Sequence, residues 1–98
     1  MNKLSFIVLA ALVTTPALAA DIAAGKAKTT ACASCHGPDG KSVMPTYPNL
    51  HGQNAAYLEK QLKAFKSGDR VDPVMKPMAS MLSDDDIKNV AAYYQSLK

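Results

Sequence analysis

The sequence predicts an all-α fold, with three main helices joined by two long loops. No segment alternates apolar and polar residues with the period of two that a half-buried strand requires, and β-branched residues are scattered along the chain. Apolar residues instead recur at helical spacing, and Gly- and Pro-rich segments separate the predicted helices. We therefore expect a small helical domain without a sheet.

The first residues resemble a secretory signal peptide. Lys3 provides a positive start, an apolar stretch covers Leu4–Val13, and Ala17-Leu18-Ala19 matches the small-x-small cleavage pattern. We expect cleavage after Ala19, with cleavage after Ala20 as the near alternative. The apolar stretch is shorter than the roughly 20 residues that span a bilayer, so we expect no stable membrane insertion.

Removal of residues 1–19 from the 98-residue chain leaves one domain of 79 residues, 20–98. A core of this size rarely contributes more than ~3–5 kcal/mol and usually needs an additional cross-link or cofactor. The net charge of +3 includes Lys3, so the mature chain carries +2, which is too weak to indicate a nucleic-acid partner. The chain has two charged runs, Lys60, Lys63 and Lys66, and Asp84-Asp85-Asp86. We interpret both as solvated surface. The alternative is that they form a weak dipole that orients the protein toward a charged partner.

The first helix is predicted from Ile22 to Ala33, with Asp21 as its N-cap. Gly37-Pro38-Asp39-Gly40 has strong turn chemistry and ends the segment that follows this helix. From Lys41 to Gly52 the chain is rich in Pro, Asn and Gly, which predicts an irregular loop.

The second helix is predicted to start near Asn54. Leu58, Leu62 and Phe65 fall at i, i+4 and i+7, which gives an amphipathic stripe, and Gly68 stands where a C-terminal glycine belongs.

A second irregular segment is expected from Asp69 to Leu82, where Pro73 and Pro77 prevent a long helix. The last helix starts at Ser83, which forms a capping-box-like pair with Asp86. Its predicted buried face consists of Ile87, Val90, Ala91, Tyr94 and Leu97.

The most informative motif is Cys32-Ala33-Ser34-Cys35-His36. Two thiols about one helical turn apart, followed directly by an imidazole, are typical of a haem attached through two thioethers, with His36 as the proximal iron ligand. A thiol redox site would need a preceding strand, and a zinc site would need four ligands, whereas His51 is the one further histidine. A disulfide between Cys32 and Cys35 would close a very small loop and stabilise little. We expect one covalently attached haem c.

The imidazole of His36 needs its second ring nitrogen held, usually by a backbone carbonyl, to fix its tautomer and orientation. Pro48-Asn49-Leu50 is the candidate segment, because proline fixes φ and orients the carbonyl. Leu50 can pack on the porphyrin.

On these motifs the chain resembles the class I cytochromes c, specifically the short mono-haem bacterial type (c-553-like), whose module occurs twice in di-haem relatives. The resemblance implies the cytochrome c fold, a hydrogen bond from His36 to the Pro48 carbonyl, and a helix crossing of Gly25 against Tyr93. It covers essentially the whole mature chain. It is carried by Cys32–Gly37, Pro48–Gln53, Tyr57 with Gln61-Leu62, and Leu82-Ser83-Asp84 leading to Ala91-Ala92-Tyr93.

An electron-carrying haem needs a second axial ligand, and the soft thioether of methionine favours the ferrous state. The candidates are Met44, Met75, Met78 and Met81, and Met44 lies too near the attachment motif to reach the opposite face. In short members of the resembled family the ligand lies seven residues before the leucine of the last helix start, which implies Met75. On the same pattern Met78 is an apolar contact; Met78 and then Met81 are the alternatives.

Four further polar residues are candidates for the surroundings of the haem. His51 follows Leu50 directly and is interpreted as a surface residue rather than a distal ligand. Tyr47, Gln53 and Arg70 are possible partners of the haem propionates, without a ranking among them.

The sequence therefore predicts a monomeric periplasmic carrier that passes single electrons between redox protein partners through a haem ligated by His36 and Met75, and that is not an enzyme. The acidic run at Asp84–Asp86 is better explained as a helix start than as a pair of catalytic carboxylates. Two alternatives remain, namely a five-coordinate haem gas sensor or haem enzyme, and a thiol oxidoreductase without haem.

Overall fold

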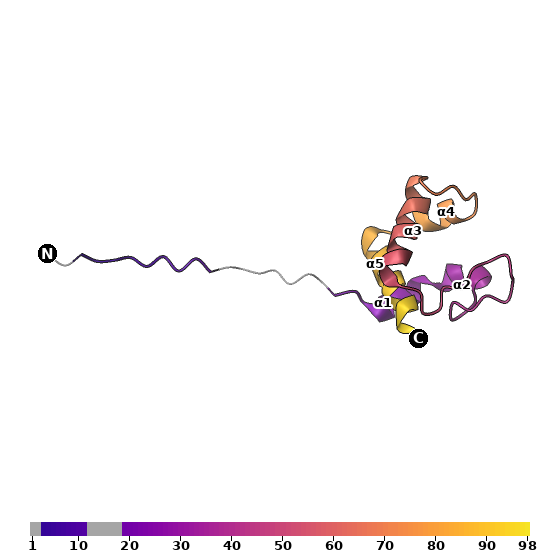
Figure 1. Cartoon of the computed structure of the whole chain (residues 1–98), viewed down its shortest axis with the longest axis horizontal. Helices are drawn as coiled ribbons and strands as arrows, with labels where there is room; N and C mark the ends of the chain where they lie inside the picture. Colours follow the sequence, from indigo (N-terminus) through magenta and orange to yellow (C-terminus); the bar gives the residue numbers. More distant parts are fainter. Residues whose placement is uncertain (1–2, 12–18) are drawn as a thin grey trace.

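The computed structural model describes residues 3–11 and 19–98, and the described chain is all-helical, as predicted. Residues 3–11 form an extended, exposed segment that contributes nothing to the core (Figure 1). Ala17 and Leu18 of the predicted cleavage pattern lie outside the described residues. The helices are α1 (Ile22–Lys28), α2 (Thr30–His36), α3 (Ala55–Ser67), α4 (Met75–Ser80) and α5 (Asp84–Ser96).

The first helix differs from its prediction, because it breaks at Thr29 into α1 and α2. Thr29 is buried, and its Oγ1 donates a hydrogen bond to the carbonyl of Lys26 at 2.7 Å, while its backbone N–H donates to the same carbonyl at 3.1 Å. A threonine hydroxyl that bonds the backbone three residues earlier competes with the regular helical pattern. The predicted helix Ile22–Ala33 was therefore wrong in its continuity and its end, and Cys35 and His36 lie within α2. The predicted N-cap is confirmed, since Asp21 Oδ1 accepts from the N–H of Ala24 at 3.0 Å.

The helices α1 and α5 cross at Gly25, which is buried. A Cβ at this position would lie 2.1 Å from the carbonyl oxygen of Asn89 and 3.0 Å from the nitrogen of Val90. The predicted glycine crossing is present, but the atoms nearest to Gly25 are the backbone of Asn89 and Val90 rather than the ring of Tyr93. Asn89 also accepts a hydrogen bond from the N–H of Asp21 at 2.9 Å, which ties the start of α1 to α5.

The amphipathic helices α3 and α5 pack together to form the core. The core cluster comprises Leu58, Val90, Ala91, Tyr93 and Tyr94, with Leu62 and Leu97 partly buried against it. The predicted face of α5 is therefore confirmed, with Leu97 at its half-buried end. At the start of α3, the N–H of Ala55 donates to Gln95 Oε1 at 2.7 Å, and Gly68 ends the helix in the left-handed conformation.

The segment predicted to be irregular from Asp69 to Leu82 contains the six-residue helix α4. Pro77 is its third residue, where the missing N–H costs no helical hydrogen bond. The predicted absence of a long helix is confirmed, but a short helix forms after Pro73 and includes Pro77. At the start of α5 the predicted capping box is present, since Ser83 Oγ accepts from the N–H of Asp86 at 3.1 Å and Asp86 Oδ2 accepts from the N–H of Ser83 at 3.0 Å.

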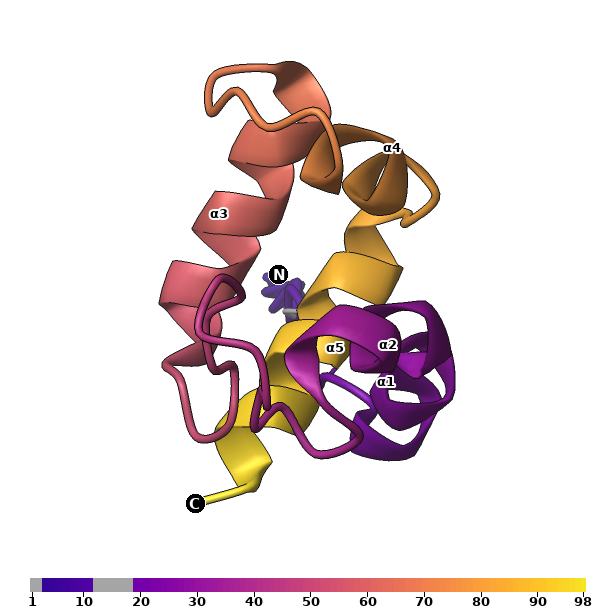
Figure 2. The same ribbon diagram turned by 90° about the vertical axis from the view of Figure 1, so that its right-hand side faces the viewer.

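The other helices are arranged around α5. Helices α1 and α2 lie on one side of α5 and α3 lies on the other, while α4 spans the end between α3 and α5 (Figure 2). The long loop between α2 and α3 runs across the front of this arrangement (Figure 2). Within the described residues, no helix combines the length and the apolar character needed to cross a membrane.

Candidate functional site

The attachment motif lies on α2, with both cysteines as free, half-buried thiols. Cys32 packs against the core cluster. Burial raises the pKa of the Cys32 thiol, and the hydroxyl of Tyr94 and a backbone hydrogen bond oppose this increase. The thiol side chains at positions 32 and 35 are separated by about one turn of the same helix. The local geometry therefore presents two thiols from one short, rigid segment.

His36 is the last residue of α2 and is buried, with 7 % of its surface exposed. Its Nδ1 lies 2.8 Å from the carbonyl oxygen of Pro48, which is the pair that the resemblance implied. A carbonyl oxygen can only accept, so Nδ1 donates and carries the hydrogen. The neutral imidazole then keeps the lone pair of Nε2 free to bind a metal ion.

The loop that carries Pro48 is held by hydrogen bonds on both sides of the proline. The carbonyl of Gly40 accepts from the N–H of Leu50 at 2.7 Å, and Asn49 Oδ1 accepts from the N–H of Ser42 at 2.7 Å. Gly40 has a φ of 78°, and a Cβ there would lie 3.0 Å from ring carbons of Tyr94. These contacts fix the Pro48 carbonyl relative to α2. They also place Leu50 against the core cluster.

A cavity of about 180 Å³ brings part of the predicted site together. Cys32 lies in its wall with three of the candidate methionines, Met75, Met78 and Met81, although His36 is not among the lining residues. Met44 is 53 % exposed and also lies outside this lining, which agrees with its predicted exclusion. The wall is mostly apolar, and comprises Lys28, Ala31, Cys32, Leu62, Met75, Met78, Ala79, Met81 and Leu82.

Met75 is the first residue of α4 and is half-buried. Asp72 holds its backbone, because Asp72 Oδ1 accepts from the N–H of Met75 at 2.8 Å and from the N–H of Val74 at 2.9 Å. These two hydrogen bonds, that of Met75 first, lower the pKa of Asp72. The sequence analysis did not identify Asp72, although an Asp-Pro pair before a short helix is a recognised turn signal.

The remaining polar candidates for the surroundings of the haem each contact a different part of the chain. His51 is partly exposed, and its Nδ1 lies 2.9 Å from the carbonyl of Asp39, which is consistent with a surface role. Tyr47 meets the ring of His36 edge-on, with ring centroids 6.3 Å apart. Gln53 accepts from the N–H of the next residue at 2.9 Å, and Arg70 donates to Gln61 at 2.7 Å with its guanidinium 4.5 Å from the centre of the Phe65 ring.

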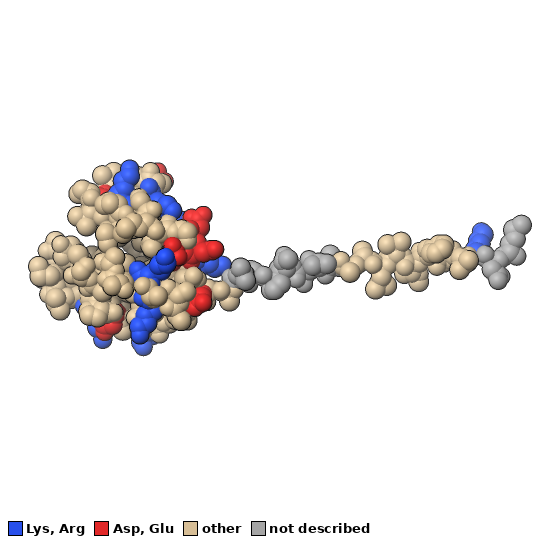
Figure 3. Space-filling view, turned by 180° about the vertical axis from the view of Figure 1, so that it is seen from behind, with Lys and Arg blue, Asp and Glu red and all other residues tan. Residues whose placement is uncertain are grey.

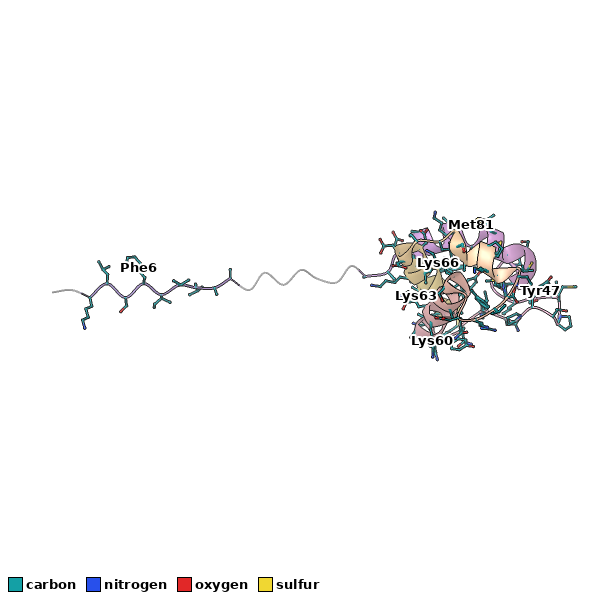
Figure 4. All side chains as sticks on the ribbon, turned by 90° about the horizontal axis from the view of Figure 1, so that it is seen from above. Phe6, Tyr47, Lys60, Lys63, Lys66 and Met81 are labelled. Atoms are coloured by element: carbon teal, nitrogen blue, oxygen red, sulfur yellow. The ribbon has the colours of Figure 1, made fainter. Side chains whose placement is uncertain are left out.

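The lysines of α3 do not form a purely solvated row. Lys60, Lys63 and Lys66 follow one another along the helix (Figure 4), but Lys66 is half-buried and donates to the carbonyl of Leu82 at 2.5 Å. It thereby links α3 to the connection before α5. Acidic and basic side chains lie next to one another on the face shown in Figure 3. Lys28 and Asp86 form an ion pair with 3.8 Å between Nζ and Oδ2.

The residues present fit a covalently held haem. Two thiols one turn apart, a buried imidazole with one nitrogen already paired, and an apolar wall with thioethers are the donor set that such a group requires. Among the described residues, no group of three or more His, Cys, Asp and Glu side chains is arranged to hold a metal ion.

Comparisons with known proteins place the chain in a family. The family model described as cytochrome c matches residues 22–98. The chain is similar to cytochrome c-554(548) of Halomonas halodenitrificans, with 51 % identity over 81 residues that cover 80 % of this chain and 98 % of the relative. It is also similar to cytochrome c4 of Pseudomonas aeruginosa, with 42 % identity over 100 residues that cover all of this chain and 50 % of the relative. The crystal structure of reduced recombinant cytochrome c4 from Pseudomonas stutzeri superimposes with a TM-score of 0.77 and 40 % identity, covering 82 % of this chain and 47 % of that one. The chain thus spans nearly the whole of the first relative and about half of the cytochromes c4.

Proposed function

The chain belongs to the cytochrome c family, and we propose that it is a mono-haem electron carrier of the periplasm with His36 and Met75 as the axial iron ligands. The class is that of the bacterial class I c-type cytochromes, which transfer electrons. Beyond this class, we propose the iron ligands, the number of haem groups, the compartment and the kind of partner.

The observation that carries the proposal is the hydrogen bond between His36 Nδ1 and the Pro48 carbonyl at 2.8 Å. It selects one tautomer, and burial keeps water from competing for the second nitrogen. His36 therefore has Nε2 as the ring nitrogen that can bind iron.

Cys32 and Cys35 would hold the haem through thioether bonds, and Leu50 would pack on its apolar surface. When bound, the haem iron would supply one-electron chemistry. The residues of the chain would hold its ligands in place and exclude water from them. No substrate has to bind, so we propose that the protein is not an enzyme.

The placement of Met75 supports its role as the second axial ligand. It lines the same cavity as Cys32, is half-buried, and starts a helix whose first N–H groups Asp72 fixes. Met78 lines that cavity one turn later and would act as an apolar contact. Met81 is 65 % exposed, which disfavours it as a ligand, because solvent competes at an exposed site.

The compartment and partners follow from the rest of the chain. We propose that residues 1–19 are a signal peptide that directs export to the periplasm and is removed there. Export also suits two cysteines that are committed to haem attachment. The partners would be redox proteins that donate and accept single electrons, and the carrier would act as a monomer.

Two substitutions test the iron ligation. Met75→Ala is expected to remove the methionine-to-iron absorption band of the oxidised holoprotein and to lower its reduction potential, because the thioether favours the ferrous state. Met78→Ala is the matched control, and is expected to keep the band and only loosen the packing around the cavity. Absorption spectroscopy and a redox titration measure both effects.

Carbon monoxide provides a second readout on the same variants. The reduced wild-type protein should bind it weakly, because both axial positions are filled, whereas reduced Met75→Ala should bind it rapidly and tightly. Rapid, tight binding by the wild type would instead indicate a five-coordinate sensor or haem enzyme. Loss of the band in Met78→Ala but not in Met75→Ala would show that the assigned ligand is wrong.

A further inference from the structure

Among the described residues, the hydroxyl of Tyr94 is a buried side-chain oxygen without a hydrogen bond of regular geometry. Tyr94 has 2 % of its surface exposed, and the side chains of Cys32 and Thr29 lie near enough to its hydroxyl to shift its pKa. Buried polar groups are nearly always paired, because a hydroxyl removed from water without a new partner is costly. An orphaned hydroxyl in the core therefore calls for a partner that forms only in the working protein.

Two side chains interact with this hydroxyl, those of Thr29 and Cys32. Thr29 Oγ1 already donates its hydrogen to the carbonyl of Lys26 at 2.7 Å. Cys32 packs against the core cluster that contains Tyr94 and also lines the cavity. Burial, and then the nearby Cys32 thiol, raise the pKa of Tyr94, so its hydroxyl stays protonated and can act as a donor.

The chemical state of Cys32 decides which group donates. A free thiol carries its own hydrogen and can act as a weak donor or a weak acceptor. A thioether sulfur carries none, so it can only accept. After attachment of a haem the Tyr94 hydroxyl is the donor next to an acceptor, and the orphaned group gains a partner.

We propose that the hydroxyl of Tyr94 donates a hydrogen bond to the Cys32 sulfur when that sulfur is a thioether, and that this bond raises the reduction potential of the haem. The inference rests on the proposed function and assigns Tyr94 a positioning and tuning role, not a ligand role. The hydroxyl hydrogen, which carries the positive end of the O–H dipole, would point toward the haem edge. A partial positive charge at the haem edge would favour the reduced, ferrous state over the ferric state. Hydrogen bonds around redox cofactors generally tune the reduction potential in this way.

Tyr94→Phe tests the proposal in the holoprotein, with Tyr93→Phe as the matched control from the neighbouring buried position. Tyr94→Phe is expected to lower the equilibrium constant for reduction, by at most about three-fold, because only the difference in strength of one weak hydrogen bond between the ferric and ferrous states acts on this constant. Tyr93→Phe is expected to leave this constant unchanged. Spectroelectrochemical titration of the three proteins at one pH measures the effect, and a chemical denaturation curve of each separates tuning from loss of packing.

An unchanged potential in Tyr94→Phe, together with a gain in stability, would overturn the proposal, because it would show that the hydroxyl is still unpaired. The proposed electron-carrier function would survive that result. A wild-type protein recovered without haem would overturn both, so the two failures can be told apart.

A measurement on the wild type does not depend on the variant folding. In the diamagnetic ferrous holoprotein, proton NMR should show a slowly exchanging Tyr94 hydroxyl signal with a cross-peak to the β protons of Cys32. A cross-peak to Thr29 in its place would assign the hydrogen bond to the threonine and refute the role of the sulfur.

Discussion

Replacement of Gly25 by alanine should separate the two helices that the domain packs most extensively. The added Cβ would lie 2.1 Å from the Asn89 carbonyl oxygen, and ordinary contact begins at 3.4 Å, so α1 and α5 would have to move apart by about 1.3 Å. The three nearest atoms, the Asn89 carbonyl oxygen and carbon and the Val90 nitrogen, all belong to the backbone of α5, which cannot rotate away as a side chain can. The strain therefore falls on the interface itself.

The expected cost follows from two opposing effects. Overpacking of a tight core costs about 1–3 kcal/mol. The upper end applies here, because the contact at Gly25 involves rigid backbone atoms. Alanine is favoured over glycine in a helix by about 1 kcal/mol. The net loss of unfolding free energy is therefore about 2 kcal/mol, or roughly 8–16 °C in the melting temperature of a domain of this size.

Guanidinium unfolding of the holoprotein, followed by circular dichroism, measures this loss. Ala23→Gly is the control, because Ala23 is exposed on the same helix and reports helix propensity alone, with an expected loss of about 1 kcal/mol. If Gly25→Ala were as stable as the wild type or more stable, the gain in helix propensity would exceed the steric cost at the helix crossing. The close approach of α1 and α5 would then be refuted.

Two further predictions concern the start of α5. Ser83→Ala removes the hydroxyl that accepts from the N–H of Asp86 and should lower the unfolding free energy by about 1 kcal/mol in a urea titration; an unchanged midpoint would contradict the capping role. The pKa of Asp86 is lowered chiefly by the hydrogen bond from the Ser83 N–H, so its carboxylate stabilises the fold above the ordinary value of 3.8 and loses this effect as the pH falls through the lowered pKa. The stability advantage of the wild type over Asp86→Asn, measured at neutral pH, should therefore shrink below about pH 4; a constant difference from pH 7 to pH 2 would show that the charge of Asp86 contributes nothing.

Local rules explain why much of the fold could be predicted from the sequence. The capping box at Ser83 and Asp86, the N-cap at Asp21 and the glycine that ends α3 each depend on residues within one or two turns. The attachment motif is equally local, since its spacing sets which side chains one helix can present together. The pairing of His36 with Pro48 spans 12 residues, and the resemblance to a known family implied it.

Two local features were nevertheless not predicted, although they also arise from residues close together in the sequence. The break at Thr29 arises from a hydroxyl that bonds the backbone, a competition that a helical pattern of small residues does not reveal. The turn of helix at α4 forms beside two prolines because Asp72 satisfies its first N–H groups. Both features depend on side-chain hydrogen bonds to the backbone, one at Thr29 and two at Asp72, which the hydrophobic pattern does not record.

The amino-acid sequence by itself determined the all-helical class, the attachment motif, the capped starts of the first and last helices and the set of candidate methionines, because these depend on short-range geometry and on the chemistry of single residues. Tertiary structure alone decided that Gly25 meets the backbone of Asn89, that Tyr94 lies beside Cys32, and that Met75 shares a cavity wall with Cys32. The physical reason is that these contacts join segments more than 40 residues apart. Their distances are set by how the helices cross, and no spacing along the chain records a crossing.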